Sequence, residues 1–168
     1  MQTSVEHKGI GPRSVRCFVL TVSDTRTDDT DTSGRAIAAM LTDAGHTVVS
    51  RAIVKDDAAQ VKSAIERQIA SGTVDVVIST GGTGISPRDT TFEAVDSLLE
   101  KRLDGFGELF RMLSYQQIGS SAMMSRATAG LSAGRVVIAL PGSEGAVRLA
   151  MEKLVIPELG HLVQQARK

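Results

Sequence analysis

Four short runs rich in β-branched residues are the feature that most limits the folds open to this chain. They extend from Arg16 to Val22, Thr47 to Val54, Val74 to Thr80 and Arg135 to Leu140. Three of the runs are apolar on both faces, which is typical of strands that helices cover on two sides. Helical patterns separate successive runs. This alternating order predicts an α/β protein, a three-layer αβα sandwich with a mostly parallel central sheet.

The helical patterns between the runs have defined ends. We expect one helix from about Ser33 to Ala44 and another from about Asp57 to Ser71, because a glycine that can stop a helix follows each of them. A third helix is expected to open with a capping box, in which Thr90 is the N-cap and Glu93 occupies the N3 position. These helices supply the outer layers that the strand pattern requires.

The pattern changes between Leu103 and Gly130, where short helical segments carry many apolar side chains. We interpret this stretch as an additional helical layer. Its Phe and Met side chains and Tyr115 also suggest a surface that meets a partner subunit. A last helix follows Ser143, and Pro157 is expected to interrupt it.

Length and charge limit the possible functions. The 168 residues suit a single domain, which we place at residues 15–168 after a flexible, polar arm at residues 1–14. Lys and Arg total 19, as do Asp and Glu, so no overall charge attracts nucleic acid or anionic lipid. No apolar run approaches the roughly 18 residues of a membrane span. We therefore expect a cytoplasmic protein that binds neither nucleic acid nor membrane.

Several common chemistries find little support in the sequence. The single cysteine, Cys17, lies in an apolar run, where a thiol most often behaves as a small core side chain. The three histidines are scattered and cannot form a recognisable zinc site with one cysteine. No Gly-x-Ser-x-Gly nucleophile motif occurs.

A glycine-rich loop follows the third run, with the sequence Thr80-Gly81-Gly82-Thr83-Gly84. Glycines let the backbone turn tightly and bring its N–H groups close to an oxyanion. Further along the loop, Arg88 is suited to bind phosphate and Asp89 to hold a divalent cation. The loop matches neither the P-loop nor the Rossmann fingerprint. We therefore predict a site for an anionic, phosphorylated ligand, in preference to a purely structural turn.

Three other strand ends face the same edge of the predicted sheet, where ligands bind in open α/β proteins. The first strand runs into Ser23 and Asp24; the other aspartates of that loop are solvated, with Asp31 or Ser33 as a helix cap. The second strand is followed by Asp56, a freer carboxylate than the helix-capping Asp57 beside it. The last strand ends in a second small-residue turn that suits an anion at a helix N-terminus. Its residues are Pro141, Gly142, Ser143 and Glu144.

These loops carry a resemblance to a known family. Its motifs are Thr21-Val22-Ser23-Asp24, Asp31-Thr32-Ser33-Gly34, Thr80-Gly81-Gly82-Thr83-Gly84, Arg88-Asp89 and Leu140-Pro141-Gly142-Ser143. In this order and spacing they resemble the MoaB/MogA family of molybdenum cofactor biosynthesis proteins, over nearly the whole chain after about Ser14. The segment from Gly105 to Ser114 is more similar to the MoaB branch than to the MogA branch.

The resemblance implies a pocket for molybdopterin, a dithiolene pterin with a terminal phosphate, and a second site for Mg-ATP as co-substrate. No permanently bound cofactor is expected. By the same resemblance Asp56 and Asp89 would be the catalytic aspartates and the Mg²⁺ ligands. The substrate and nucleotide would contact Ser23, Asp24, Thr80, Gly81, Gly82, Thr83, Gly84, Arg88, Pro141, Gly142, Ser143 and Glu144.

The resemblance also implies a homo-oligomer, either a homotrimer or a homohexamer. Two functions remain open on this resemblance. One is a molybdopterin adenylyltransferase that releases pyrophosphate, and the other is a non-catalytic molybdopterin binder or carrier of the same pathway. The pair Arg88-Asp89 favours the enzyme, whereas an acidic Glu144 beside a phosphate site would weaken anion binding unless it serves the metal. A third candidate, a nucleotide-dependent oxidoreductase, is disfavoured because the dinucleotide fingerprint is missing.

Overall fold

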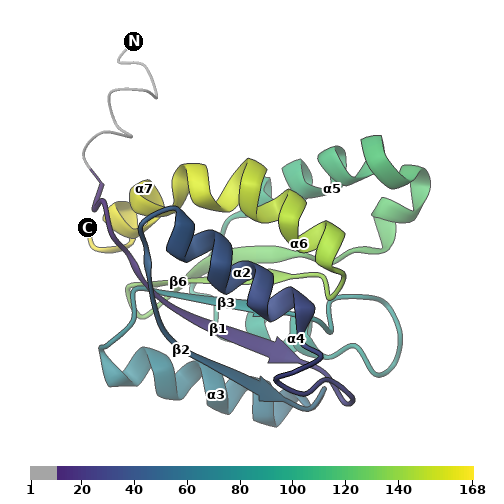
Figure 1. The fold of residues 1–168 in the computed structure, drawn as a ribbon, viewed down its shortest axis with the longest axis horizontal. Helices are drawn as coiled ribbons and strands as arrows, with labels where there is room; N and C mark the ends of the chain where they lie inside the picture. Colours follow the sequence, from purple (N-terminus) through teal and green to yellow (C-terminus); the bar gives the residue numbers. More distant parts are fainter. Residues whose placement is uncertain (1–10) are drawn as a thin grey trace.

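The computed structural model describes residues 11–168, which form a central sheet between layers of helices (Figure 1). Within these residues the sheet has six strands in the order β2-β1-β3-β6-β5-β4. Neighbours from β2 to β6 are parallel, whereas β5 is antiparallel to both β6 and β4. The strands are β1 (Arg16–Val22), β2 (Thr47–Val54), β3 (Val76–Thr80), β4 (Lys101–Arg102), β5 (Thr128–Ser132) and β6 (Arg135–Leu140).

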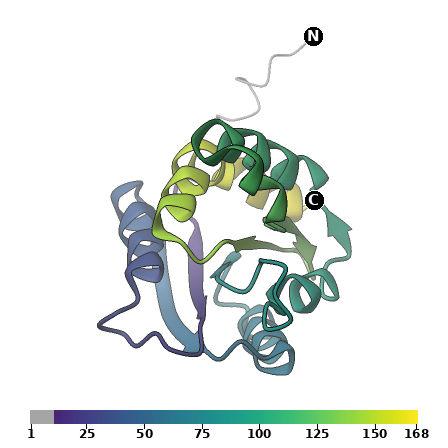
Figure 2. The ribbon, with the colours of Figure 1, turned by 90° about the vertical axis from the view of Figure 1, so that its right-hand side faces the viewer.

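Helices cover both faces of the sheet, as Figure 2 shows end-on. One apolar layer lies under α2, α5, α6 and α7 and includes Ile37 and Phe110, and the other lies under α3 and α4 and includes Ile65 and Val95. The predicted αβα sandwich with a mostly parallel sheet is confirmed. The helical elements are α2 (Thr32–Asp43), α3 (Ala58–Ser71), α4 (Thr91–Asp96), α5 (Asp104–Ile118), the 3₁₀ helix η1 (Gly119–Met124), α6 (Glu144–Ala150), the π segment η2 (Met151–Val155) and α7 (Ile156–Ala166).

Strand burial follows the position of each strand in the sheet. Nearly every side chain of β1, β3 and β6 is buried, as their apolar runs predict for strands covered on two sides. The remaining predicted strand, β2, is half-exposed because it is an edge strand that pairs only with β1. Cys17 lies fully buried in β1, which confirms its prediction as a core side chain.

The stretch from Leu103 to Gly130 differs from the prediction of short helical segments alone. It contains the continuous 15-residue helix α5, then η1, and it enters the strand β5. β5 pairs with β6 through a tight hairpin at Ala133 and Gly134, whose φ angles are 46° and 71°. The prediction missed β5 because its sequence, TAGLS, has no long apolar run, and tertiary pairing alone makes it a strand.

Helix ends agree closely with the sequence signals. Asp31 caps α2 by accepting a hydrogen bond from the N–H of Gly34, and Asp57 caps α3 in the same way. Gly72 ends α3 in a left-handed conformation with φ of 68°. The interruption expected near Pro157 is present as the π segment η2 directly before α7.

Most of the predicted N-terminal arm, residues 1–10, lies outside the described residues. Gly11, in the last part of that arm, lies close against α7. A Cβ atom added to Gly11 would lie 2.6 Å from the carbonyl carbon of Gly160. None of the helices in the described part of the chain is long and apolar enough to cross a membrane.

Candidate functional site

Four loops meet at the carboxyl edge of the parallel strands, the edge that faces the viewer in Figure 2. They follow β1, β2, β3 and β6, and they contain the residues that the sequence nominated for the site, except Thr80 at the end of β3 and Glu144 at the start of α6. Chain topology thus brings together segments that are up to about 120 positions apart, as parallel strand ends require.

The glycine-rich loop lies closely against its neighbours. Gly81 and Gly82 have φ angles of 100° and 71°, a backbone region that favours glycine. A Cβ atom on Gly81 would lie 2.2 Å from the carbonyl oxygen of Val22, at the end of β1. A Cβ atom on Gly82 would lie 2.1 Å from Oγ1 of Thr91. The loop therefore requires glycine at both positions so that its backbone can pass between β1 and α4.

Hydrogen bonds join this loop to the turn after β6. The N–H of Gly81 donates to the carbonyl oxygen of Leu140 at 3.0 Å, and Oγ1 of Thr80 donates to that of Pro141 at 2.7 Å. From α2, Oγ of Ser33 donates to the carbonyl oxygen of Gly142 at 2.8 Å. These bonds fix the two small-residue turns side by side, around a small cavity of about 90 Å³.

Contacts between charged residues link the loops after β1, β2 and β3. The N–H of Asp56 donates to Oδ1 of Asp24 at 3.1 Å, and Arg88 forms an ion pair with the other oxygen of Asp24. The hydrogen bond from Arg88, followed by that from Asp56, lowers the pKa of the Asp24 carboxyl below its ordinary value. Arg88 is largely exposed, so its guanidinium is accessible to solvent beside this ion pair.

Asp56 links the loop after β2 to the start of α4. Its Oδ1 accepts hydrogen bonds from Oγ1 of Thr90 at 2.9 Å and from the N–H of Thr90 at 3.2 Å. Thr90 occupies the N-cap position of α4 and Glu93 the N3 position, as predicted, but the capping box itself is wrong, because the Thr90 side chain forms no cap hydrogen bond and Glu93 pairs instead with Arg126. The Thr90 hydroxyl is turned toward the Asp56 carboxylate, to which it donates a charge-assisted hydrogen bond.

Asp89 closes the end of the glycine-rich loop. Its Oδ2 accepts a hydrogen bond from the N–H of Ser86, and its own N–H donates to the carbonyl oxygen of Ser86, both at 2.9 Å. Gly84 lies beneath this carboxylate, since a Cβ atom there would lie 2.8 Å from Oδ2 of Asp89. A cavity of about 350 Å³ lies beside the turn and is lined by Ser86, Asp89 and Thr90, among others.

The turn after β6 is less free than the sequence indicates. Ser143 is the N-cap of α6, and its Oγ accepts a hydrogen bond from the N–H of Ala146 at 3.3 Å. Glu144 accepts hydrogen bonds from Arg148 one turn later at 2.8 and 3.0 Å. This ion pair offsets the acidic charge of Glu144 beside Ser143.

Two carboxylates at this edge are candidates for binding a metal ion together with other ligands. No group of three or more His, Cys, Asp or Glu side chains within residues 11–168 could hold a metal ion by itself. Asp56 contacts Thr90, and Asp89 directly precedes Thr90 in the chain. The two carboxylates come from two different loops. Mg²⁺ is commonly bound through one or two carboxylates with substrate phosphates and water completing the shell. The hydroxyl of Thr91, buried against Gly82, has no hydrogen-bond partner among the described side chains and backbone.

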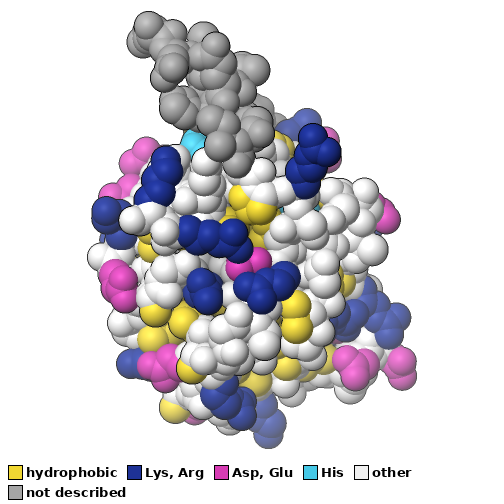
Figure 3. All heavy atoms as spheres, turned by 90° about the vertical axis from the view of Figure 1, so that its left-hand side faces the viewer, with side chains coloured by type: hydrophobic (Ala, Val, Ile, Leu, Met, Phe, Trp, Pro, Cys, Tyr) yellow, Lys and Arg dark blue, Asp and Glu magenta, His cyan; other side chains and the backbone are white. Residues whose placement is uncertain are grey.

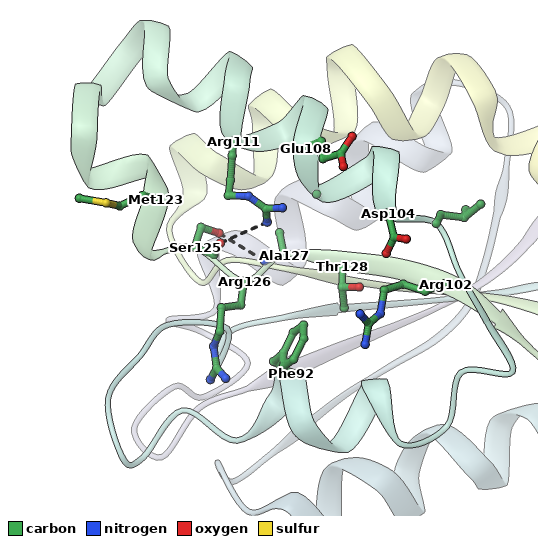
Figure 4. A pocket seen from close by; sticks show the side chains of 12 residues that line it. Phe92, Arg102, Asp104, Glu108, Arg111, Met123, Ser125, Arg126, Ala127 and Thr128 are labelled. Atoms are coloured by element: carbon green, nitrogen blue, oxygen red, sulfur yellow. Dashed lines mark hydrogen bonds between the residues drawn. The ribbon is translucent and has the colours of Figure 1, made fainter.

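Sequence reasoning missed one residue that contacts the loop directly. Arg126 precedes β5 and donates from its Nε and Nη2 to the carbonyl oxygen of Gly84, at 2.9 and 2.7 Å. It also lines a cleft of about 430 Å³ between α4, α5 and β5, with Phe92 and Arg111 (Figure 4). No local signal marked Arg126, because its contacts are with residues 37 and 42 positions earlier.

The fold and this edge define a class of α/β proteins with glycine turns and carboxylates at the carboxyl edge of a mostly parallel sheet. Residues 18–161 match the family described as "Probable molybdopterin binding domain". Molybdenum cofactor biosynthesis protein B of Bacillus anthracis is 55% identical over 158 residues, which cover 94% of each chain.

Solved structures agree with this match. The crystal structure of a Molybdenum cofactor biosynthesis protein B has a TM-score of 0.90 at 53% identity, covering 92% of this chain and 97% of that chain. The tungsten cofactor synthesizing protein MoaB from Pyrococcus furiosus has a TM-score of 0.84 at 39% identity, covering 94% and 99%. The chain belongs to the MoaB/MogA family, as its loop motifs predicted.

Proposed function

We propose that this protein acts in molybdenum cofactor biosynthesis by binding molybdopterin and adenylylating it with Mg-ATP. Family membership and the names of the relatives support the first part. The observation that supports the second part is the contact of Asp56 with both Asp24 and Thr90, which joins the loops after β1, β2 and β3 next to Arg88 and Asp89. Two ligands with phosphate groups fit an edge with two glycine turns better than one ligand does.

The proposed reaction joins the pterin phosphate to AMP. An oxygen of the terminal phosphate of molybdopterin attacks the α-phosphorus of ATP, a new P–O bond forms, and the bond to the β-phosphate oxygen breaks to release pyrophosphate. Such a transfer needs positioning and charge neutralisation more than a covalent nucleophile. Backbone N–H groups of Gly82 to Gly84 would orient the nucleotide, Arg88 would offset phosphate charge, and Asp56 and Asp89 would hold Mg²⁺. The bound ion would supply further charge neutralisation.

The protein would work as a homo-oligomer in the cytoplasm. Large apolar side chains are exposed on one continuous segment, α5 and η1, which supports a contact with a second copy. Multi-angle light scattering distinguishes a trimer from a hexamer. The exposed side chains are Leu109, Met112, Tyr115, Ile118, Met123 and Met124.

The test is to incubate the purified protein with molybdopterin and Mg-ATP and to assay adenylylated molybdopterin and pyrophosphate. We expect Asp89→Asn to reduce the rate at least about a hundredfold, because the isosteric amide keeps an acceptor for Ser86 but loses the charge. Asp57→Asn is the matched control at the same edge. It loses one charge but retains a good helix cap, so its rate should match that of the wild type.

One observation favours the alternative, a non-catalytic molybdopterin binder or carrier. In the structure Arg88 is paired with Asp24, and the Asp89 carboxylate is bonded to its own loop. If these contacts persist when ligands bind, neither group would reach the nucleotide. Stoichiometric binding of molybdopterin by the wild type, with no adenylylated product, would establish the binder and eliminate the enzyme.

A further inference from the structure

Arg126 holds the glycine-rich loop from outside. It lies between η1 and β5, yet its backbone N–H donates to the carbonyl oxygen of Thr83 at 3.0 Å. Its guanidinium donates through two nitrogens to the carbonyl oxygen of Gly84 and through Nη2 to that of Asp89 at 3.2 Å. One side chain therefore binds both ends of the turn that runs from Gly84 to Asp89.

Arg126 thus contacts the turn that carries the Asp89 carboxylate. Inside the turn, Ser86 and Asp89 are joined by two mutual hydrogen bonds of 2.9 Å, which fix the local shape of the turn. The guanidinium of Arg126 fixes where the base of that turn lies relative to the sheet. Without it, the turn would keep its shape but could swing about the glycines at its start.

The guanidinium is itself oriented by α4. It forms an ion pair with Glu93, and its carbon atom lies 4.9 Å from the centroid of the Phe92 ring (Figure 4). Its side chain is 29% exposed, so these contacts are partly shielded from water. The planar fork can satisfy two carbonyl oxygens and a carboxylate together, which a lysine ammonium cannot do with the same geometry.

We infer that Arg126 is a positioning residue, which holds the loop from Thr83 to Asp89 in the shape that presents Asp89 to the ligand. Its effect on turnover rests on the proposed function, whereas its effect on the loop rests on the contacts alone. A different role, direct charge contact with a bound phosphate, would need only a positive charge at this position. Arg126→Lys separates the two roles, because it keeps the charge and loses the fork.

The experiment is hydrogen exchange with mass spectrometry on the full, ligand-free chain. Five amides in or next to the loop donate a hydrogen bond there. Those of Ser86, Arg88 and Asp89 bond within the turn, whereas the amide of Thr90 donates to Asp56 and that of Thr91 to Gly82, so the last two report on where the turn lies. We expect Arg126→Lys to speed exchange of the peptide that contains them by about tenfold or more. Arg111→Lys is the matched control, since Arg111 lines the same cleft but donates to Ser125 instead of the loop.

Two further measurements keep the test decisive. Thermal unfolding shows whether Arg126→Lys folds; if it does not, Glu93→Gln removes the ion pair while keeping Arg126, and it should speed exchange of the same peptide by a smaller factor. In the adenylylation assay we expect Arg126→Lys to lower kcat about tenfold or more. A wild type that makes no product defeats the proposed enzyme and leaves the exchange comparison valid. Loop exchange that is unchanged in both variants overturns the inference.

Discussion

At the scale of single residues, the site needs glycine because a larger side chain would collide with neighbouring atoms, and not because the loop must be flexible. Gly82 has a positive φ, and any side chain there would enter the space of Thr91 and Asp56. In contrast, the position that a Cβ atom would take on Gly105 in α5 has no heavy atom within 4 Å, so its surroundings are open. A side chain is therefore excluded at Gly82, whereas the surroundings of Gly105 have room for one.

Gly82→Ala should destabilise the protein by about 2 kcal/mol or more, because left-handed backbone and a side-chain collision both oppose alanine. Gly105→Ala should leave stability unchanged or raise it by up to about 1 kcal/mol, since alanine is the better helix residue. Urea unfolding followed by circular dichroism measures both. A Gly82→Ala protein as stable as the wild type would show that the loop does not need glycine at this position.

At the scale of elements, the start of α2 is tied to the site through a buried carboxylate. Asp31 is 2% exposed; its Oδ1 accepts from the N–H of Gly34 at 2.9 Å and its Oδ2 from Oγ1 of Thr21 at 2.7 Å. The first turn of the same helix carries Ser33, which bonds to Gly142. The cap thus helps to position the turn after β6.

Asp31→Ala should reduce the free energy of unfolding by about 2 kcal/mol, because it removes a helix cap and leaves the Thr21 hydroxyl without its acceptor. Asp29→Ala, in the same loop but fully exposed, should leave it nearly unchanged. Chemical denaturation of both variants is the measurement. Equal losses in the two would mean that the buried contacts of Asp31 contribute nothing.

At the scale of the whole molecule, Asp75 joins the amino end of the sheet to the end of the chain. It lies buried before β3 and accepts hydrogen bonds from the backbone and guanidinium of Arg16 and from Arg167 after α7. Figure 3 shows this face, with Lys and Arg side chains gathered near acidic ones. Burial raises the pKa of the Asp75 carboxyl, but the hydrogen bonds from Arg16 and Arg167 outweigh burial and hold that pKa well below its ordinary value.

The lowered pKa predicts a pH dependence of stability. A carboxyl with a lower pKa in the folded state contributes stability above its unfolded pKa of about 3.9 and loses that contribution as pH falls further. Asp75→Asn should therefore cost about 2 kcal/mol at pH 7, with the deficit shrinking as pH falls below about 4. The exposed Asp43→Asn is the control. Unfolding free energies from pH 2 to 7 test this, and a deficit that does not depend on pH would contradict it.

The sequence alone determined the parts of this protein that depend on neighbours in the chain. Buried runs indicated β1, β3 and β6, and cap and stop residues such as Asp57 and Gly72 located the helices, because these signals act within a few residues. Motifs after the strands nominated the site, since parallel strands must end at a common edge. Family comparison confirmed the resemblance that those motifs suggested.

Only the tertiary structure decided the contacts between distant segments. The strand β5 forms because β6 and β4 pair with it, and the side chain of Thr90, the N-cap residue of α4, donates to Asp56 at 2.9 Å instead of capping the helix. Arg126 reaches the loop across 42 residues of sequence. Such choices depend on which polar groups the fold brings together and on the cost of leaving a buried one unpaired, and no local pattern encodes that competition.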